Sequence, residues 1–259
     1  MSNDAFGAVG VLRRSQDRLA QTVSRLDAAG IRAPSYSSEW SVAQVLSHLG
    51  SQAEVFGALM EAGLTGADPP GQESFPPIWD AWNARSPEEQ VADSITDNEA
   101  FIERMEALDA AQRDSFRLAA FGMDIDFPMF LRMRVSEHAV HTWDVVVSVD
   151  PSATLAPDAV ELLVEGLPQL VARVGKPIGS PFTLRVSTTD TEQRFVLVVS
   201  DDVRLEPWFE RDVDGVLRLS SEELVRLVYG RLDPSHTPSA TLEADAMSLD
   251  DVRAVFPGV

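Results

Sequence analysis

Apolar residues recur every three to four positions along most of the chain up to residue 150. This spacing is the period of a helix that buries one face. We therefore predict four long helices, at residues 5–29, 41–62, 86–108 and 128–149. Four amphipathic helices in this order favour an antiparallel bundle.

Local signals support the boundaries of these helices. Ser41 is followed three positions later by Gln44, which is the spacing of a capping box at a helix start. Pro87 directly follows Ser86, and proline is favoured in the first turn behind a serine cap. Gly30 and Gly63 are the expected ends of the first two helices. Residues 64–77 are rich in proline and glycine and predict a loop, while the pattern of residues 111–127 is ambiguous.

The pattern changes after Pro151. One helix is expected at residues 157–174, and short β-rich runs bounded by polar turns follow it. The expected strands and later helices are strands at 182–190, 193–201, 203–209, 214–220 and 239–245, and helices at 220–232 and 248–258. The predicted fold class is α+β: a four-helix bundle in residues 1–150, followed by a smaller α/β domain in residues 151–259.

Composition narrows the possible partners. The net charge of −20 repels nucleic acid and anionic membranes, so neither is an expected partner. No apolar run approaches the roughly 18 residues of a membrane span, and the N-terminus lacks the pattern of a signal peptide, so we expect a cytoplasmic protein. The chain contains no cysteine, so any thiol chemistry requires an external thiol. Oligomeric state is left open.

One face of the helix at residues 128–149 carries candidate chemistry. At about 100° per residue, an arc of roughly 80° holds five polar side chains: Arg134, Glu137, His141, Asp144 and Ser148. Glu137 and His141 lie one turn apart, as metal ligands on a bundle helix do. Apolar residues border the arc, which favours burial. The alternative is a solvent-facing stripe with an ion pair between Arg134 and Glu137.

Three other histidines compete for a role. His48, in the second helix, is a candidate third ligand, although a lone histidine there is more often a residue of the core. His138 is adjacent to Glu137 and is a rival ligand that spacing does not exclude. His236 lies in the turn-like segment DPSHTP and is expected at the surface.

Two segments together resemble the mycothiol-dependent maleylpyruvate isomerase family, which is related to the DinB-like metal-binding bundles. These segments are EWSVAQVLSHLG and RMRVSEHAVHTWD. The first matches a family pattern in which Trp and Ser or Thr precede a ligand His, here Trp40, Ser41 and His48. The second matches Arg-x-x-Glu-x-x-x-His-x-x-Asp.

The resemblance implies a site and a second domain. Its metal ligands are His48, Glu137 and His141, a set that suits zinc with an open fourth position and that also accepts iron, nickel or cobalt. Asp144 is expected to orient His141. The family's C-terminal domain resembles sterol-carrier folds, and Tyr229-Gly230-Arg231 resembles its Gly-Arg element.

Two arginines are further candidates for the catalytic machinery. Arg134 is expected to orient Glu137 or to hold a substrate carboxylate through paired hydrogen bonds. Arg231 has the same expected role from the second domain, with a salt bridge as its alternative.

The implied function is metal-dependent thiol chemistry. A divalent metal, zinc first, activates mycothiol for addition to an electrophilic substrate. The reaction is then an isomerisation of the maleylpyruvate type, or an S-transfer if the adduct is the product. The alternatives are a non-catalytic module that binds a metal or ligand, and, ranked lower, a metal-dependent hydrolase.

Overall fold

The computed structural model describes residues 2–37 and 39–258, and of residues 2–6 it describes the backbone alone. Met1 and Val259, the ends of the two predicted domains, lie outside the described residues. The chain divides into two compact units, residues 1–159 and 160–259. The boundary that we predicted near residue 151 falls just before this division. No helix among the described residues is long and apolar enough to cross a membrane.

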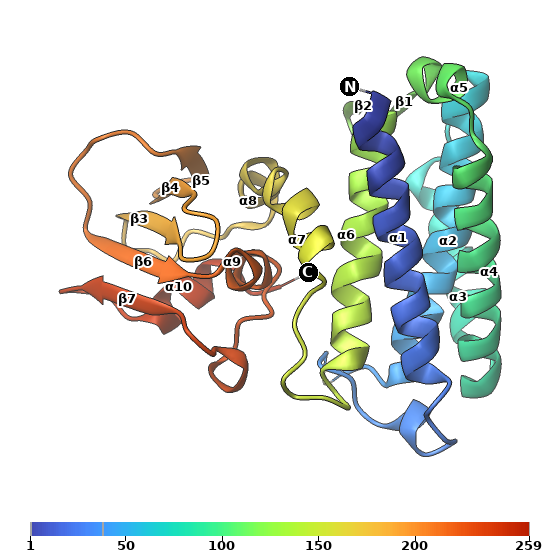
Figure 1. Ribbon diagram of the computed structural model, residues 1–259, viewed down its shortest axis with the longest axis horizontal. Coiled ribbons are helices and arrows are strands. Elements are labelled where there is room, and N and C mark those ends of the chain that lie inside the picture. Colours follow the sequence, from blue (N-terminus) through green and yellow to red (C-terminus); the bar gives the residue numbers. More distant parts are fainter. Residues whose placement is uncertain (1, 38, 259) are drawn as a thin grey trace. The chain divides into compact units, whose positions relative to one another are not determined.

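The first unit is built around four long helices that run side by side (Figure 1). They are α1 Ser2–Val23, α2 Val42–Thr65, α4 Pro87–Ala107 and α6 Phe127–Val146. Both predicted helix starts are confirmed: Ser41 and Gln44 form a capping box, and so do Ser86 and Glu89. The fold class, a helical unit followed by a unit with a sheet, is confirmed.

The predicted antiparallel arrangement is wrong for two pairs of neighbouring helices. Asn98 donates to the carbonyl of Leu49, and Arg104 pairs with Glu61 further along both helices, so α2 and α4 run in parallel. Helix α1 is likewise parallel to α6, where Ser15 meets His138 and Leu19 and Val23 pack near Val145.

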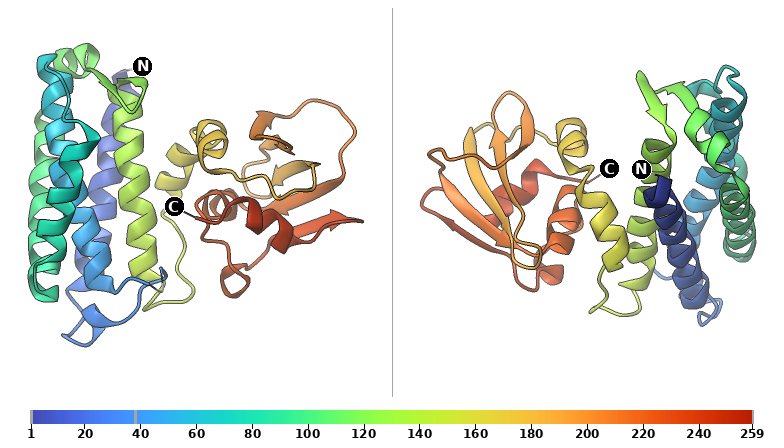
Figure 2. Two further views of the ribbon diagram at one scale, coloured as in Figure 1. Left: turned by 180° about the vertical axis from the view of Figure 1, so that it is seen from behind. Right: turned by 45° about the horizontal axis from the view of Figure 1, so that its top comes forward.

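A helix that we did not predict explains why α2 and α4 are parallel. Residues Phe75–Asn83 form α3, with prolines in its first turn, and the short 3-10 helix Gln72–Ser74 precedes it. The predicted loop at 64–77 is therefore wrong for residues 72–77. This segment carries the chain back along the bundle before α4 begins (Figure 2).

Other boundaries also differ. Helix α1 ends at Val23, not near Gly30, and α2 continues through Gly63 to Thr65, with Gly66 in the left-handed region as its cap. Gly63 is inside the helix because Phe116 packs on it: a Cβ there would lie 2.3 Å from the Phe116 ring. The ambiguous segment forms helix α5 Ala110–Ser115 and a hairpin of β1 Arg117–Ala120 and β2 Met123–Asp126.

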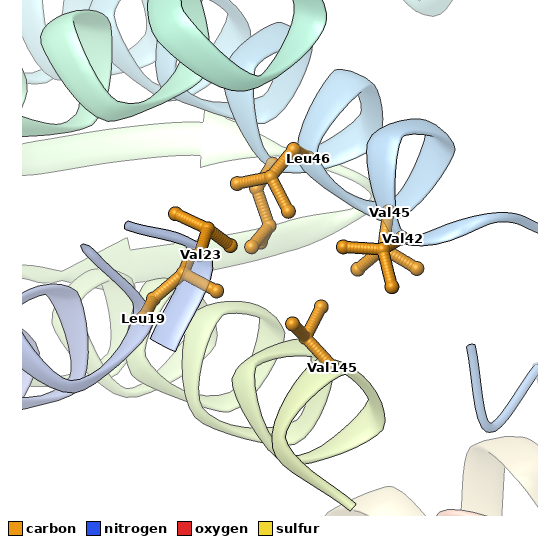
Figure 3. Packing of buried hydrophobic residues seen from close by; sticks show 7 residues of the cluster. Leu19, Val23, Val42, Val45, Leu46 and Val145 are labelled. Carbon is orange, nitrogen blue, oxygen red and sulfur yellow. The ribbon is translucent and has the colours of Figure 1, made fainter. Parts of the chain in front are cut away.

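Apolar side chains from three helices meet in the interior near the start of α2. Several of them are shown in Figure 3, where α1, α2 and α6 each contribute branched aliphatic side chains. The cluster consists of Leu19, Val23, Val42, Val45, Leu46, Leu49 and Val145. Its position fixes the first turns of α2 against α6, and these two helices carry the candidate ligands.

The second unit contains a five-stranded sheet with the order β5-β4-β3-β6-β7. Strands β3 and β6 are parallel and the other neighbours are antiparallel. The strands are β3 Phe182–Thr188, β4 Arg194–Val199, β5 Val203–Pro207, β6 Gly215–Leu219 and β7 Thr241–Ala244. The sequence predicted all five strands, but each predicted range extends beyond the observed strand. Buried and part-buried residues alternate along β3 and β6, so one face of the sheet is the more deeply covered.

Helices complete this unit. They are α8 Leu167–Val174, α9 Ser221–Val228 and α10 Leu249–Val255, together with the 3-10 helix Pro234–His236. The single helix predicted at 157–174 is wrong: α7 Pro157–Val164 ends, and α8 starts anew behind Gly166 with Pro168 in its first turn. A proline inside a helix removes a hydrogen bond and clashes with the preceding turn, so the chain restarts there.

Candidate metal centre

Three ligand-type side chains converge between α2 and α6. His48 comes from α2, and Glu137 and His141 come from successive turns of α6. The Nε2 atom of His48 lies 3.1 Å from Oε2 of Glu137, and Nε2 of His141 lies 3.9 Å from the same oxygen. One ligand atom from each of the three residues lies within 4.8 Å of the other two.

The donor set and its spacing fit a divalent metal. Metal–ligand bonds of about 2.0–2.2 Å in a tetrahedral site place ligand atoms roughly 3.3 Å apart. The two distances to Glu137 lie on either side of that value. Two imidazoles and one carboxylate leave a coordination position open, as catalytic zinc sites do.

The protonation states suit ligation. Burial raises the pKa of Glu137, but the hydrogen bond with His48 and the nearby imidazoles and Arg134 outweigh it, so its pKa falls to about 2. Burial lowers the pKa of His48, and the hydrogen bond with Glu137 opposes this only in part. At neutral pH the site therefore holds a carboxylate and a neutral His48 imidazole, the forms that bind metals.

Asp144 fixes the orientation of His141. Its carboxylate oxygen Oδ2 lies 2.9 Å from Nδ1 of His141, and the side chain of Asp144 is fully buried. Because a carboxylate oxygen accepts, Nδ1–H donates to it, and Nε2, which faces Glu137, is the nitrogen left for a metal. The backbone carbonyl of Asp144 also accepts from the amide of Tyr36, which ties this turn of α6 to the loop before α2.

Trp40 covers both imidazoles. Its ring centroid lies 5.4 Å from that of His48 and 6.2 Å from that of His141, where the two rings are stacked. The carbonyl of Trp40 accepts from the amide and the hydroxyl of Ser35, which holds this loop closed. The tryptophan of the sequence motif thus shields the candidate ligands from part of the solvent.

Two residues of the polar arc on α6 are fully buried, so the prediction of a buried stripe is confirmed for these two. Arg134 and Asp144 expose no surface, whereas Ser148, which lies beyond the end of α6, is exposed. The guanidinium of Arg134 donates to Asn98 Oδ1 and to the carbonyl of Leu49, and lies 5.6 Å from the ring centroid of Phe101. Burial lowers the pKa of Arg134 to about 10, so it remains charged at neutral pH.

The rival His138 lies away from the cluster. Its Nε2 is 3.0 Å from Gln16 Oε1, and its Nδ1 is 2.8 Å from the hydroxyl of Ser15. Gln16 donates its own amide to the carbonyl of Ile95, so its oxygen faces the imidazole and accepts from Nε2–H. Both ring nitrogens are therefore engaged with α1, and burial holds the pKa of His138 well below its ordinary range.

Arg231 and His236, the other two residues singled out in the sequence, lie in the second unit. Arg231 is buried just after α9 and donates to the carbonyl of Tyr229. Its expected role toward a substrate stays a prediction. His236 is half-buried, and its Nδ1 lies 2.9 Å from a carboxylate oxygen of Asp233. It ends the short 3-10 helix of this unit.

Some residues that border the site were not predicted from the sequence. A cavity beside His48 is lined in part by Trp79 and Asn83 of α3, a helix that we did not predict. The run IWDAWN behind two prolines was the available signal, because prolines in a first turn are compatible with a helix. The loop prediction from composition obscured it.

The fold and site together define a class: a helical bundle that presents two histidines and a carboxylate, followed by a unit with a mixed sheet. Residues 12–146 match the model of the mycothiol maleylpyruvate isomerase N-terminal domain. The chain belongs to this family.

Two solved structures share the fold over most of the chain. They are a mycothiol-dependent maleylpyruvate isomerase, at 15% sequence identity, and a histidine-to-alanine mutant of a mycothiol-dependent maleylpyruvate isomerase, at 16%. Each alignment covers 91% of both chains with a TM-score of 0.68. Among curated protein sequences, none is similar enough to this chain to count as a match.

Proposed function

We propose that this protein is a mycothiol-dependent metalloenzyme that adds the thiol to an electrophilic substrate. The observation that carries this proposal is the convergence of His48, Glu137 and His141 on one point, with one ligand atom from each within 4.8 Å of the others. Family membership supports mycothiol as the thiol. The absence of cysteine from the sequence means that no thiol of the chain itself competes for the site.

Each residue of the centre has a separate task. His48, Glu137 and His141 hold the divalent metal, and Asp144 keeps Nε2 of His141 free to bind it. The metal supplies Lewis acidity, which lowers the pKa of a bound thiol and makes thiolate available at neutral pH. Zinc suits the donor set best, because two imidazoles and one carboxylate are typical of catalytic zinc sites.

The sulfur then acts on the substrate. Addition of the thiolate to a cis carbon–carbon double bond forms a carbon–sulfur bond and turns the double bond into a single bond that rotates. Loss of the thiolate restores the double bond in the trans geometry, so the thiol is regenerated in an isomerase. In an S-transferase the adduct takes up a proton and leaves as the product. We favour the isomerase, because the structures that share this fold are isomerases.

Arginines complete the proposal. Arg134 is fully buried and acts on the centre through its charge, since it lowers the pKa of Glu137. This makes it a positioning residue. Arg231 is proposed to bind a carboxylate of the substrate or the thiol, by analogy with the Gly-Arg element of the family.

The test measures dependence on metal and thiol together. Purified protein is stripped with a chelator and reloaded with zinc, and isomerisation of maleylpyruvate is followed with and without mycothiol. We expect turnover only when both are present, and restoration by zinc after stripping. Full turnover without thiol would refute the proposal, and full turnover of stripped protein would remove the metal from it.

A further inference from the structure

A cavity of about 520 Å³ lies beside the candidate metal centre within the first unit. Its walls come from α2, from α3 and from the loop that precedes α2. The lining residues are Trp40, Gln44, His48, Ser51, Gln52, Trp79 and Asn83. The volume lies within the range of about 300–1,000 Å³ that is typical of small-molecule sites.

The cavity follows from the helical period. Gln44, His48 and Gln52 are spaced four residues apart on α2 and therefore share one face. Trp79 and Asn83 have the same spacing on α3. The two faces line one cavity, and His48 belongs both to this cavity and to the metal centre.

Close packing fixes the second wall. The ring of Trp82 sits directly on Gly50, where a Cβ would lie only 2.2 Å from the ring. The indole nitrogen of Trp82 donates to Glu54 of α2. Because Trp82 is fully buried, it anchors α3 to α2, and the neighbouring Trp79 is left facing the cavity.

Two indole rings supply apolar surface to this cavity. Trp40 is 37% exposed and Trp79 is 40% exposed. Large exposed hydrophobic side chains are few among the described residues, and two of the four line this one cavity. Covering an exposed indole with the apolar face of a ligand removes its surface from water, which is favourable.

The carboxamides add directed hydrogen bonds. Asn83 Oδ1 accepts from the hydroxyl of Ser47, and Gln44 Oε1 accepts from the amide of Ser41. Both side chains therefore have their NH₂ groups left for other acceptors. Gln52 has no side-chain partner within the described part of the chain, so it offers a donor and an acceptor. Such groups match the hydroxyls of a ligand, which both donate and accept.

The cavity wall is almost free of charge. His48 is the one titratable side chain among the lining residues, and Arg134, the nearby cation of α6, exposes no surface. A carboxylate or phosphate bound away from the metal would lose its hydration with no cationic side chain of the lining to pair with, which is costly. The wall therefore favours an uncharged ligand.

We propose that this cavity binds the uncharged, hydroxyl-bearing rings of the thiol cosubstrate, with a ring face against Trp79 and hydroxyls on Gln44, Gln52 and Asn83. The proposal rests on the proposed function, since mycothiol carries its thiol on a sugar joined to a cyclitol. It assigns thiol selectivity to α2 and α3. The electrophile then reaches the metal centre from outside this cavity.

The kinetic test separates the two substrates. For Trp79→Ala we expect the KM for mycothiol to rise about tenfold, which corresponds to about 1.4 kcal/mol of lost binding. The KM for the electrophile should stay unchanged. Activity with N-acetylcysteine amide, which has the thiol without the rings, should also stay unchanged. Asp80→Ala, an exposed neighbour that does not line the cavity, is the control.

The outcomes decide between occupants. An increase in the KM for the electrophile alone would place the electrophile in the cavity and overturn the proposal. An unchanged KM for mycothiol would overturn it as well. Gln52→Ala is the second variant and should raise the KM for mycothiol in the same selective way.

A binding measurement separates this inference from the proposed function. S-methylated mycothiol cannot offer a thiolate, so its binding to metal-stripped protein is followed by isothermal titration calorimetry. Binding to the wild type that is weakened in Trp79→Ala supports the inference even if turnover is never found. Turnover that needs mycothiol, without any binding of the S-methyl probe, would overturn the inference and leave the proposed function standing.

Discussion

His141 Nδ1 lies 2.9 Å from Oδ2 of Asp144, and that carboxylate is fully buried one turn further along α6. The pair settles which nitrogen of His141 is available to a metal, because a ring nitrogen that donates its hydrogen to a carboxylate cannot be a ligand. Such partners orient the imidazole and increase its basicity. The spacing of three residues that we noted in the sequence thus becomes a specific hydrogen bond.

Replacing Asp144 by Asn should weaken metal binding while keeping the shape of the side chain. Loss of the negative charge reduces the basicity of His141, and changes of this kind cost about 10–100-fold in metal affinity. Competition with a chelator at fixed pH measures the affinity. Asp80→Asn, an exposed change on α3, is the control. An unchanged affinity in folded Asp144→Asn protein would show that this carboxylate does not act on the metal.

Replacing His48 by alanine should change metal binding, whereas replacing His138 should change stability. His48→Ala should abolish stoichiometric metal binding with little loss of stability, since its ring is partly exposed. His138→Ala should keep the metal ligands but lower the free energy of unfolding by about 2–4 kcal/mol, because a buried hydrogen-bonded ring is removed from between α1 and α6. Metal analysis and urea unfolding of both variants check this. Metal retention in His48→Ala would remove His48 from the ligand set.

The sequence was sufficient for the features that depend on local spacing. The capping box of Ser41 and Gln44 needs only two residues three positions apart, and the structure contains it. The buried stripe of α6 follows from the helical period in the same way. The strands of the second unit were predictable because β-rich runs alternate with polar turns.

The features that were missed depend on contacts far apart in the chain. Gly63 resembles a helix stop until Phe116 is seen to pack against it. The neutral network of His138 requires Ser15 and Gln16, which lie more than a hundred positions away. Helix α3 was missed because its segment is rich in proline, and so the residues of α3 that line the cavity were missed as well.

Glu223 should make the stability of the second unit depend on pH. Burial raises its pKa, but hydrogen bonds from the amides and hydroxyls of Ser220 and Ser239 outweigh this, so the pKa of Glu223 is lowered overall. A lowered folded-state pKa stabilises the fold above the ordinary value of about 4.3. This contribution is lost as the pH falls through the folded-state pKa.

We therefore expect Glu223→Gln to lower the free energy of unfolding by about 2 kcal/mol at pH 7. The difference in unfolding free energy between wild type and variant should shrink below about pH 4.3. There the carboxyl of the unfolded wild type is protonated, and the charge of the folded Glu223 no longer favours the folded state as much. Urea unfolding at several pH values measures both effects. Glu210→Gln, at an exposed position of the same unit, should show neither. A difference that stays constant down to pH 3 would contradict the role of the charge.

Gly50 and Gly57, two glycines of α2, should respond oppositely to alanine. A Cβ at Gly50 would lie 2.2 Å from the ring of Trp82, whereas a Cβ at Gly57 would meet only the tip of Arg104 at 3.6 Å. Gly50→Ala should therefore displace α3 and cost about 1–3 kcal/mol of stability. Gly57→Ala should gain up to about 1 kcal/mol from helix propensity.

Because α3 carries Trp79, Gly50→Ala should also raise the KM for mycothiol while metal content stays unchanged. Thermal unfolding, metal analysis and thiol kinetics of both variants test this, and an unaltered KM in a destabilised Gly50→Ala protein would separate the packing of α3 from thiol binding.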